Sequence, residues 1–200
     1  MQKTLVGLAC FIAPLSLATQ ATGQLAQADA QTRTDAASPL VLQPRDGEAR
    51  LRRRPPAALS GIAAPFLIKV DPTGKNGSAQ DFFVFAESVP VGASIAPHKH
   101  PHAEELIFIH DGHGTAWLDG HEAKLEPGTI IYMPRNTCVR LVNDGKAPIA
   151  LIAVFSRQGF DTYQRAISVA AGQPAKPLTA EELNAIRSMH EDSVIYDSKP

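Results

Sequence analysis

Two histidines and a glutamate stand close together near the middle of the sequence, within the stretch 92–105. His98 and His100 are separated by one residue, and Glu105 follows five positions after His100. Neutral imidazole nitrogens and carboxylate oxygens are ligands for divalent transition metals. A set of two histidines and one carboxylate also leaves positions open for water or substrate. These three residues therefore predict an open metal site.

The elements that carry these residues must bring them to one point. Side chains alternate between the two faces of a strand, so His98 and His100 would lie on the same face. Pro101 marks a turn, and a second strand over 105–109 could return the Glu105 carboxylate to the imidazoles. His102 continues the alternating series and is a candidate additional ligand, although Pro101 could rotate it away.

The spacing resembles the first motif of the cupin superfamily, which reads Gly, five residues, His-x-His, three or four residues, Glu, six residues, Gly. All of its fixed positions are occupied here, by Gly92, His98, His100, Glu105 and Gly112. Five residue types at set distances make this match fairly specific for a short motif. The resemblance implies a small β-barrel that binds a divalent metal through His98, His100 and Glu105.

The second motif of the family is matched only in part. It expects Gly, five residues, Pro-x-Gly, two residues, His, three residues, Asn, and Gly128, Pro134 and Asn143 agree with it. Asn136 replaces the second glycine, which is tolerable because asparagine also accepts a left-handed turn conformation. Val139 replaces the histidine that usually supplies the last metal ligand, and a valine cannot coordinate a metal.

Three interpretations of Val139 are open. In the preferred one, the three first-motif ligands hold the metal alone, because three intact ligands would be odd remnants of a lost site. In the second, His102 substitutes for the missing ligand, or Cys138 does so less readily, since neighbouring strand residues face opposite sides unless a bulge shifts the register. In the third, metal binding has been lost and only a ligand pocket is left.

The resemblance implies two classes of function. One is a metal-dependent enzyme acting on a small organic molecule, with dioxygenase chemistry ahead of lyase or isomerase chemistry. The reason is that two histidines and one carboxylate resemble the facial triad of iron oxygenases, although Fe, Mn, Ni, Cu and Zn all accept these ligands. The other class is a non-catalytic cupin that binds a ligand without converting it. The expected apolar walls of the site are Ile95, Ile107, Ile109, Tyr132 and Val139, and Tyr132 is a weak candidate for an acid or base.

The beginning of the chain has the pattern of a secretory signal peptide. Residues 1–21 combine Lys3, an apolar run and then small residues, with cleavage expected between Ala21 and Ala28. The protein is therefore predicted to be exported, either to the periplasm or out of the cell. The apolar run is short for a membrane span and contains Pro14, so no stable membrane insertion is expected after processing. A net charge of −1 gives no reason to expect nucleic acid as a partner.

Composition divides the rest of the chain into three parts. Residues 22–60 are rich in Ala, Gln, Thr, Ser and Pro and are predicted to be a flexible leader, with the arginines at 50–54 interpreted as part of a solvated linker. Residues 61–158 contain about eight short strand patterns with turn signals such as Asp119-Gly120 between them. This pattern predicts an all-β protein with a small antiparallel jelly-roll barrel, which is also the cupin fold.

Residues 159–200 are predicted to form a C-terminal helical tail. A short helix is expected over 160–167 and an amphipathic helix over 180–190, with Thr179 as its N-cap and Leu183, Ile186 and Met189 on its apolar face. The tail is expected to cover the outer face of the barrel or a second subunit. Its similarity to the tails of single-domain bacterial cupins implies a possible homodimer.

Overall fold

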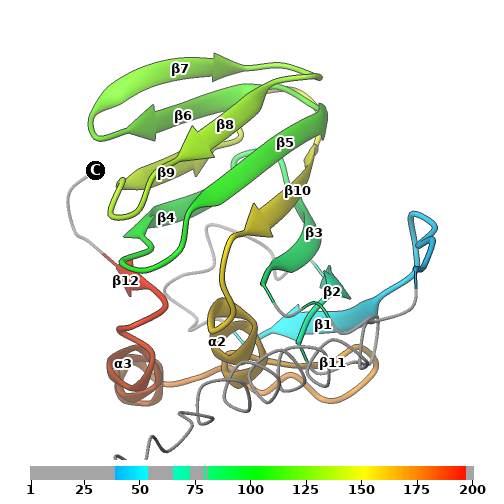
Figure 1. The fold of residues 1–200 in the computed structure, drawn as a ribbon, viewed down its shortest axis with the longest axis vertical. Coiled ribbons are helices and arrows are strands. Elements are labelled where there is room, and N and C mark those ends of the chain that lie inside the picture. Colours follow the sequence, from blue (N-terminus) through cyan, green and yellow to red (C-terminus); the bar gives the residue numbers. More distant parts are fainter. Residues whose placement is uncertain (1–38, 54–64, 73–78, 80, 197–200) are drawn as a thin grey trace, which may run out of the picture. The chain divides into compact units, whose positions relative to one another are not determined.

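Two antiparallel sheets form the body of the protein (Figure 1). The computed structural model describes residues 39–53, 65–72, 79 and 81–196, all of which belong to one compact unit, Ala37–Pro200. The predicted signal peptide and much of the predicted leader lie outside the described residues. Within the described ranges, no helix has the length and apolar character needed to cross a membrane.

The larger sheet has seven strands and the smaller sheet has five. The larger sheet has the order β11 (Ser168–Ala170), β1 (Glu48–Arg52), β2 (Pro65–Val70), β3 (Phe83–Val89), β10 (Ile149–Phe155), β5 (Glu105–Asp111) and β8 (Ile130–Met133). The smaller sheet has the order β12 (Ile195–Tyr196), β4 (Ser94–Lys99), β9 (Val139–Val142), β6 (Gly114–Leu118) and β7 (His121–Leu125). Two helices, α2 (Phe160–Ala166) and α3 (Ala180–Met189), follow β10. The predicted fold class, a small antiparallel β-barrel with a helical C-terminal part, is confirmed.

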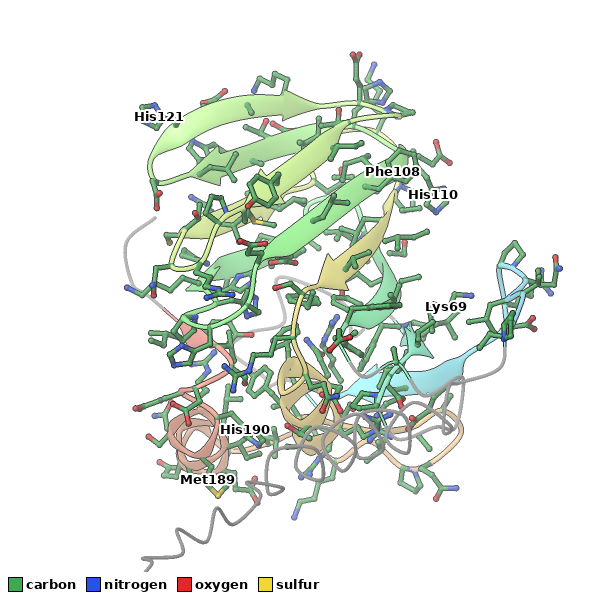
Figure 2. All side chains as sticks on the ribbon, in the orientation of Figure 1. Lys69, Phe108, His110, His121, Met189 and His190 are labelled. Carbon is green, nitrogen blue, oxygen red and sulfur yellow. The ribbon has the colours of Figure 1, made fainter. Side chains whose placement is uncertain are left out.

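Strict alternation along the strands produces the core between the two sheets. In β10 the inward residues Ile149, Leu151, Ala153 and Phe155 are each at most 1% exposed, whereas the residues between them are partly exposed. Together with the inward side chains of β3 and β5, the neighbours of β10 in the sheet, they form one continuous apolar face. A cluster of phenylalanine rings that includes Phe160, the first residue of α2, lies in this core, whereas the labelled Met189 and His190 lie at the end of α3 (Figure 2). The close packing of this core thereby limits the movement of the neighbouring metal-ligand candidates.

Two turn residues at positions of the two cupin-like motifs have a positive φ angle, which restricts the residue types that fit there. Gly112 has φ 86°, and a Cβ atom added there would lie 2.4 Å from the carbonyl oxygen of Pro148. Only glycine fits such a close approach of two backbone segments. Asn136 has φ 66°, so the left-handed conformation expected at this exchange is confirmed.

The predicted leader contains an ordered strand. Residues 48–52 form β1, which pairs with β2 on one side and with β11 on the other. The structure thus differs from a flexible leader spanning 22–60, and Arg50 and Arg52 are not part of a solvated linker. Arg50 donates hydrogen bonds from Nε to the Ser168 hydroxyl and from Nη2 to the Ser168 carbonyl. The strand gives a weak local signal because its five residues include only two apolar ones, Ala49 and Leu51.

The two helices of the tail begin close to where the sequence places them. Thr179 caps α3, and its side chain accepts a hydrogen bond from the Glu182 amide while the Glu182 carboxylate accepts one from the Thr179 amide. Leu183 and Ile186 pack against the core, but Met189 is 72% exposed. The apolar face of α3 is therefore shorter than the sequence pattern indicates.

Candidate metal site

The three predicted ligands meet at one end of the barrel. His98 lies near the end of β4, Glu105 is the first residue of β5, and His100 lies in the turn between them. Each side chain offers a ligand atom, and these atoms lie within 4.8 Å of one another. All three residues are at most 6% exposed. The structure therefore assembles the site in the way that strand alternation and the turn at Pro101 predict.

Hydrogen bonds at the far side of each imidazole orient both rings. His98 Nδ1 lies 2.9 Å from the Ala96 carbonyl oxygen, and His100 Nδ1 lies 2.6 Å from the Ser193 carbonyl oxygen. A carbonyl can only accept a hydrogen bond, so each Nδ1 carries the proton and donates it. The Nε2 atom of each ring then has a free lone pair, which is the arrangement of a histidine that binds a metal.

Two atoms of the cluster have no hydrogen-bond partner among the described residues. His100 Nε2 and Glu105 Oε2 are buried, unsatisfied and 3.4 Å apart. A buried polar atom without a partner costs roughly 1–3 kcal/mol, so native proteins rarely keep two of them side by side without a use. A divalent cation would satisfy both atoms at once, and the donor set fits such an ion.

Burial shifts the pKa value of each of the three groups in the direction that favours its neutral form. Burial raises the pKa of the Glu105 carboxyl to about 8, with a further contribution from the nearby Glu87 carboxylate. Burial and the adjacent His98 lower the pKa of His100 to about 3, although the hydrogen bond to Ser193 partly opposes this. Burial also lowers the pKa of His98. The imidazoles are thus ready to bind a metal at neutral pH, whereas Glu105 must first lose a proton.

Metal binding at pH 7 is expected to release close to one proton per ion. The proton comes from Glu105, whose pKa of about 8 keeps it mostly protonated in the metal-free protein, and the two imidazoles contribute none. The apparent affinity should rise about tenfold per pH unit below pH 8 and level off above it. Calorimetric titration in buffers of different ionisation enthalpy measures the proton count. Glu105→Gln should bind more weakly and release no proton, and a release of two or more protons by the wild type would contradict the assignment.

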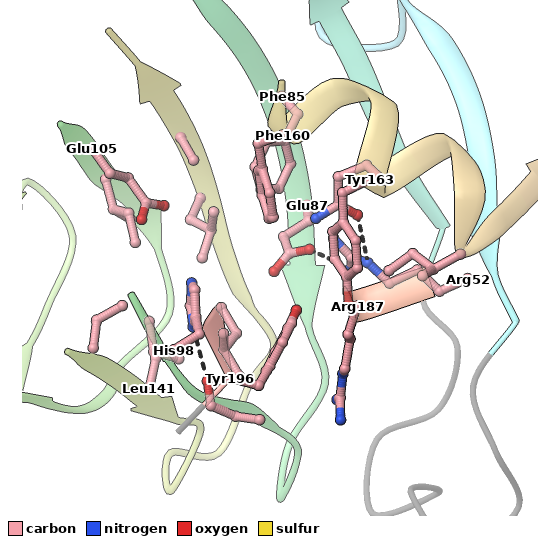
Figure 3. Close-up of a pocket in the computed structure, with 18 of the residues that line it drawn as sticks. Arg52, Phe85, Glu87, His98, Glu105, Leu141, Phe160, Tyr163, Arg187 and Tyr196 are labelled. Carbon is pink, nitrogen blue, oxygen red and sulfur yellow. Dashed lines mark hydrogen bonds and ion pairs between the residues drawn. The ribbon is translucent and has the colours of Figure 1, made fainter. Parts of the chain in front are cut away.

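The cluster opens into a cavity of about 160 Å³ that is lined mainly by apolar side chains (Figure 3). Ile95, Ile107 and Val139 belong to its wall, as the sequence predicts. Ile109 is fully buried but is not part of the wall. A cavity of roughly 150 Å³ is enough for benzene, so this one accommodates a molecule of about one ring.

Tyr132 and His102 lie away from the cluster. Tyr132 pairs with Leu106 on the outward face of β5 and β8, and it is 57% exposed. This position follows from alternation, because Glu105 faces inward and the register places Met133 opposite it. His102 is exposed and does not belong to the group of potential ligands. Neither side chain lines the cavity.

Val139 faces the site directly. It pairs with His98 across β4 and β9, is 1% exposed and lines the cavity. Cys138 is buried but belongs to no cluster of potential ligands. Among the described residues, the group that could hold a metal contains His98, His100 and Glu105 without a fourth side chain.

The C-terminal tail completes the site, which the sequence analysis did not predict. Strand β12 pairs with β4 so that Tyr196 lies opposite His98, and the two rings stack at 5.7 Å. The Arg187 guanidinium lies 4.2 Å from the centre of the Tyr196 ring. Ser193, as described above, orients His100. No local motif marks these residues, because their role depends on a pairing between segments about a hundred positions apart.

Glu87 and Arg52 also line the cavity and were missed. A signal for Glu87 was present, because the alternation in β3 that buries Phe83, Phe85 and Val89 places Glu87 on the same inward face. A charged residue at an inward strand position is uncommon and calls for a partner. Arg52 is that partner, and its Nη1 lies 2.5 Å from Glu87 Oε2.

Comparisons with known proteins agree with this architecture. Residues 85–155 match a family model described as a cupin domain. The chain is 34% identical over 64 residues to an uncharacterised protein of Methanocaldococcus jannaschii, and 31% identical over 103 residues to quercetin 2,3-dioxygenase of Bacillus subtilis. These matches cover 32% and 52% of this chain. The chain spans only 51% and 27% of the lengths of the two relatives.

A solved structure shows the same fold. A sugar phosphate isomerase of the cupin superfamily from Silicibacter pomeroyi superposes with a TM-score of 0.50 at 21% identity, covering 72% of this chain and 99% of that one. The likeness concerns the fold alone at this level of identity. The cupin domain match itself covers residues 85–155.

Proposed function

We propose that this protein is a metal-dependent enzyme that acts on a small organic molecule, with dioxygenase chemistry favoured over lyase or isomerase chemistry. One observation carries the proposal. Three buried donors, two of whose atoms lack any other partner among the described residues, face a cavity with mainly apolar walls. A site of two histidines and one carboxylate with open positions is typical of non-haem iron oxygenases. The partial similarity to a quercetin dioxygenase supports the same choice.

The residues of the site have separate tasks in this proposal. His98 and His100 bind a divalent metal through Nε2, and Glu105 binds it as a carboxylate after losing its proton. The metal would supply Lewis-acid chemistry, or redox chemistry with dioxygen in the case of iron. The apolar walls exclude water and hold the substrate next to the open positions. Val139 leaves room beside His98 where a fourth ligand would otherwise stand.

The alternative is a cupin that binds its ligand without converting it. The observation that favours it is the valine at position 139, because a site with three protein ligands holds a metal less firmly than a site with four. Cupins include both enzymes and binding proteins, so the fold alone does not decide between them. Export from the cytoplasm is part of either proposal and is supported by the pattern of residues 1–21. The homodimer stays a prediction.

Oxygen consumption by the metal-loaded protein tests the proposal. The protein is loaded separately with Fe²⁺, Mn²⁺, Ni²⁺, Cu²⁺ and Zn²⁺, its metal content is measured, and one-ring phenols and small diketones are supplied in an oxygen electrode. We expect substrate-dependent oxygen uptake with at least one redox-active metal and none in His98→Ala. Stoichiometric metal and ligand binding without turnover of any compound would favour the binding protein instead.

A further inference from the structure

A second buried carboxylate faces the metal-ligand cluster across the cavity. Glu87 lies on β3, and its side chain is 6% exposed. Figure 3 shows its carboxylate pointing into the cavity, with Glu105 on the opposite wall and His98 below. Glu87 is not a member of the metal-ligand cluster. The proposed metal site therefore gives no reason for this charge to be buried here.

Arg52 holds this carboxylate in a fixed orientation. The guanidinium of Arg52 forms an ion pair with Glu87 Oε2 at 2.5 Å, and its Nε donates to Gln164 Oε1 at 3.1 Å. The same guanidinium lies 4.4 Å from the centre of the Phe66 ring. Arg52 is thus bound on several sides by the protein itself, while one oxygen of Glu87 still faces the cavity (Figure 3).

The other cations that line the cavity are Arg53 and Arg187, and both contact groups outside the metal-ligand cluster. Arg53 Nε donates to the Lys176 carbonyl at 2.9 Å. Arg187 Nε is buried without a hydrogen-bond acceptor, but its guanidinium packs against Tyr196, on the side of the ring away from His98 in Figure 3. Among the charged side chains that line the cavity besides Glu105, Glu87 is therefore the one presented to the metal-ligand cluster, and it is a hydrogen-bond acceptor with a negative charge.

We propose that the cavity binds a small neutral molecule with a hydroxyl group, and that this hydroxyl donates a hydrogen bond to Glu87. The inference rests on the proposed function and names its substrate class. The apolar part of the molecule packs against Phe85, Leu151 and Phe160, which line the same cavity. A carboxylate ligand is disfavoured, because its charge would approach that of Glu87 in an environment of low dielectric constant. The volume of about 160 Å³ limits the molecule to roughly one ring.

Three one-ring compounds test this inference by calorimetry on zinc-loaded protein, since zinc has no redox chemistry of its own. Phenol has the hydroxyl donor, anisole replaces its proton by a methyl group, and benzoate adds a negative charge. We expect phenol to bind roughly tenfold or more tightly than anisole, because a hydrogen bond to a charged group contributes about 1.5–3 kcal/mol. Equal affinity for phenol and anisole in the wild type would overturn the inference without any mutant.

Glu87→Gln supplies the second arm of the test. It keeps the shape of the side chain but removes the charge and releases Arg52. The phenol-to-anisole ratio should fall by roughly tenfold, and benzoate should bind more tightly than it does to the wild type. Glu122→Gln is the matched control, because it removes the same charge from a residue on β7 whose side chain is 51% exposed, and it should leave all three affinities unchanged. An unchanged ratio in Glu87→Gln would refute the inference.

Zinc content, measured on the same samples, separates this inference from the proposed function. A Glu87-dependent preference for phenol in protein that cannot be loaded with zinc would refute the metal-dependent function and leave the hydroxyl site standing. Stoichiometric zinc without such a preference would refute the hydroxyl site alone.

Discussion

His100→Ala is expected to lower the affinity for a divalent metal by at least about a hundredfold. In the proposed site this histidine is one of three ligands, and losing even an outer residue that orients a ligand typically costs 10–100-fold in metal affinity. The ring is also held on both sides, by the Ser193 carbonyl at Nδ1 and by Phe155 and Phe160 at 4.9 and 4.7 Å between ring centres. Its Nε2 therefore has a fixed direction toward Glu105, which a replacement residue cannot reproduce.

Competition with a chromogenic chelator measures this loss, and circular dichroism confirms that the variant is folded. His102→Ala is the control, because this histidine is two positions away but exposed and outside the cluster. It should bind metal like the wild type. If His102→Ala weakened binding as much as His100→Ala, the turn would have to rearrange and recruit His102 as a ligand when metal binds.

Arg165→Met is expected to lower the free energy of unfolding by about 3–5 kcal/mol. Arg165 on α2 forms ion pairs with Glu48 at 2.8 Å, Asp71 at 2.5 Å and Asp161 at 3.0 Å. Asp71 is fully buried and Asp161 is 1% exposed. Removing one partner of a buried ion pair leaves an uncompensated charge, which is far more costly than losing the attraction alone. Here three carboxylates would lose their common cation and repel one another, and of the three Glu48 still pairs with Arg50.

Urea unfolding at pH 7 measures this effect. Lys124→Met is the control, since Lys124 and its partner Glu122 are 73% and 51% exposed, and a pair of this kind contributes about 0–1 kcal/mol. The partners of Arg165 lie in three places, namely in β1, directly after the end of β2, and in α2. The variant should therefore also loosen the wall of the cavity that contains Arg52. A loss below about 1 kcal/mol would mean that water or another cation reaches the three carboxylates.

The cluster of potential metal ligands could be predicted from the sequence because its geometry is local. His98, His100 and Glu105 span eight positions, and two strands joined by one turn are enough to bring them together. The barrel was predictable for a related reason, since the alternation of apolar residues along β3, β5 and β10 is clear. Tyr132 shows that a wrong assignment of strand face changes the predicted wall of the pocket. It was placed in the wall of the pocket, yet a position that alternates with the inward Ile131 and Met133 must face outward.

The rest of the site depends on pairing between distant segments. Arg52 lies in a strand that pairs with β2 and β11, and the alternation in this five-residue strand depends on Ala49 and Leu51 alone. Tyr196 and Ser193 reach the imidazoles only because β12 adds to the edge of the smaller sheet beside β4. Strands as short as β1 and β12 contain too few apolar positions to give a clear periodic signal in the sequence. The sequence therefore predicted that His98, His100 and Glu105 lie together, but not the residues that orient their side chains.

The short strand β12 has a practical consequence for work with this protein. Tyr196 stacks on His98 and lies four positions before Pro200. Four residues reach on the order of 14 Å when extended, so a polyhistidine tag attached after Pro200 would place extra imidazoles within reach of a metal centre that has open positions. Such a fusion could supply the ligand that Val139 does not, and it would then report the metal affinity of an artificial site. A C-terminal polyhistidine tag must therefore be removed before the ion is counted.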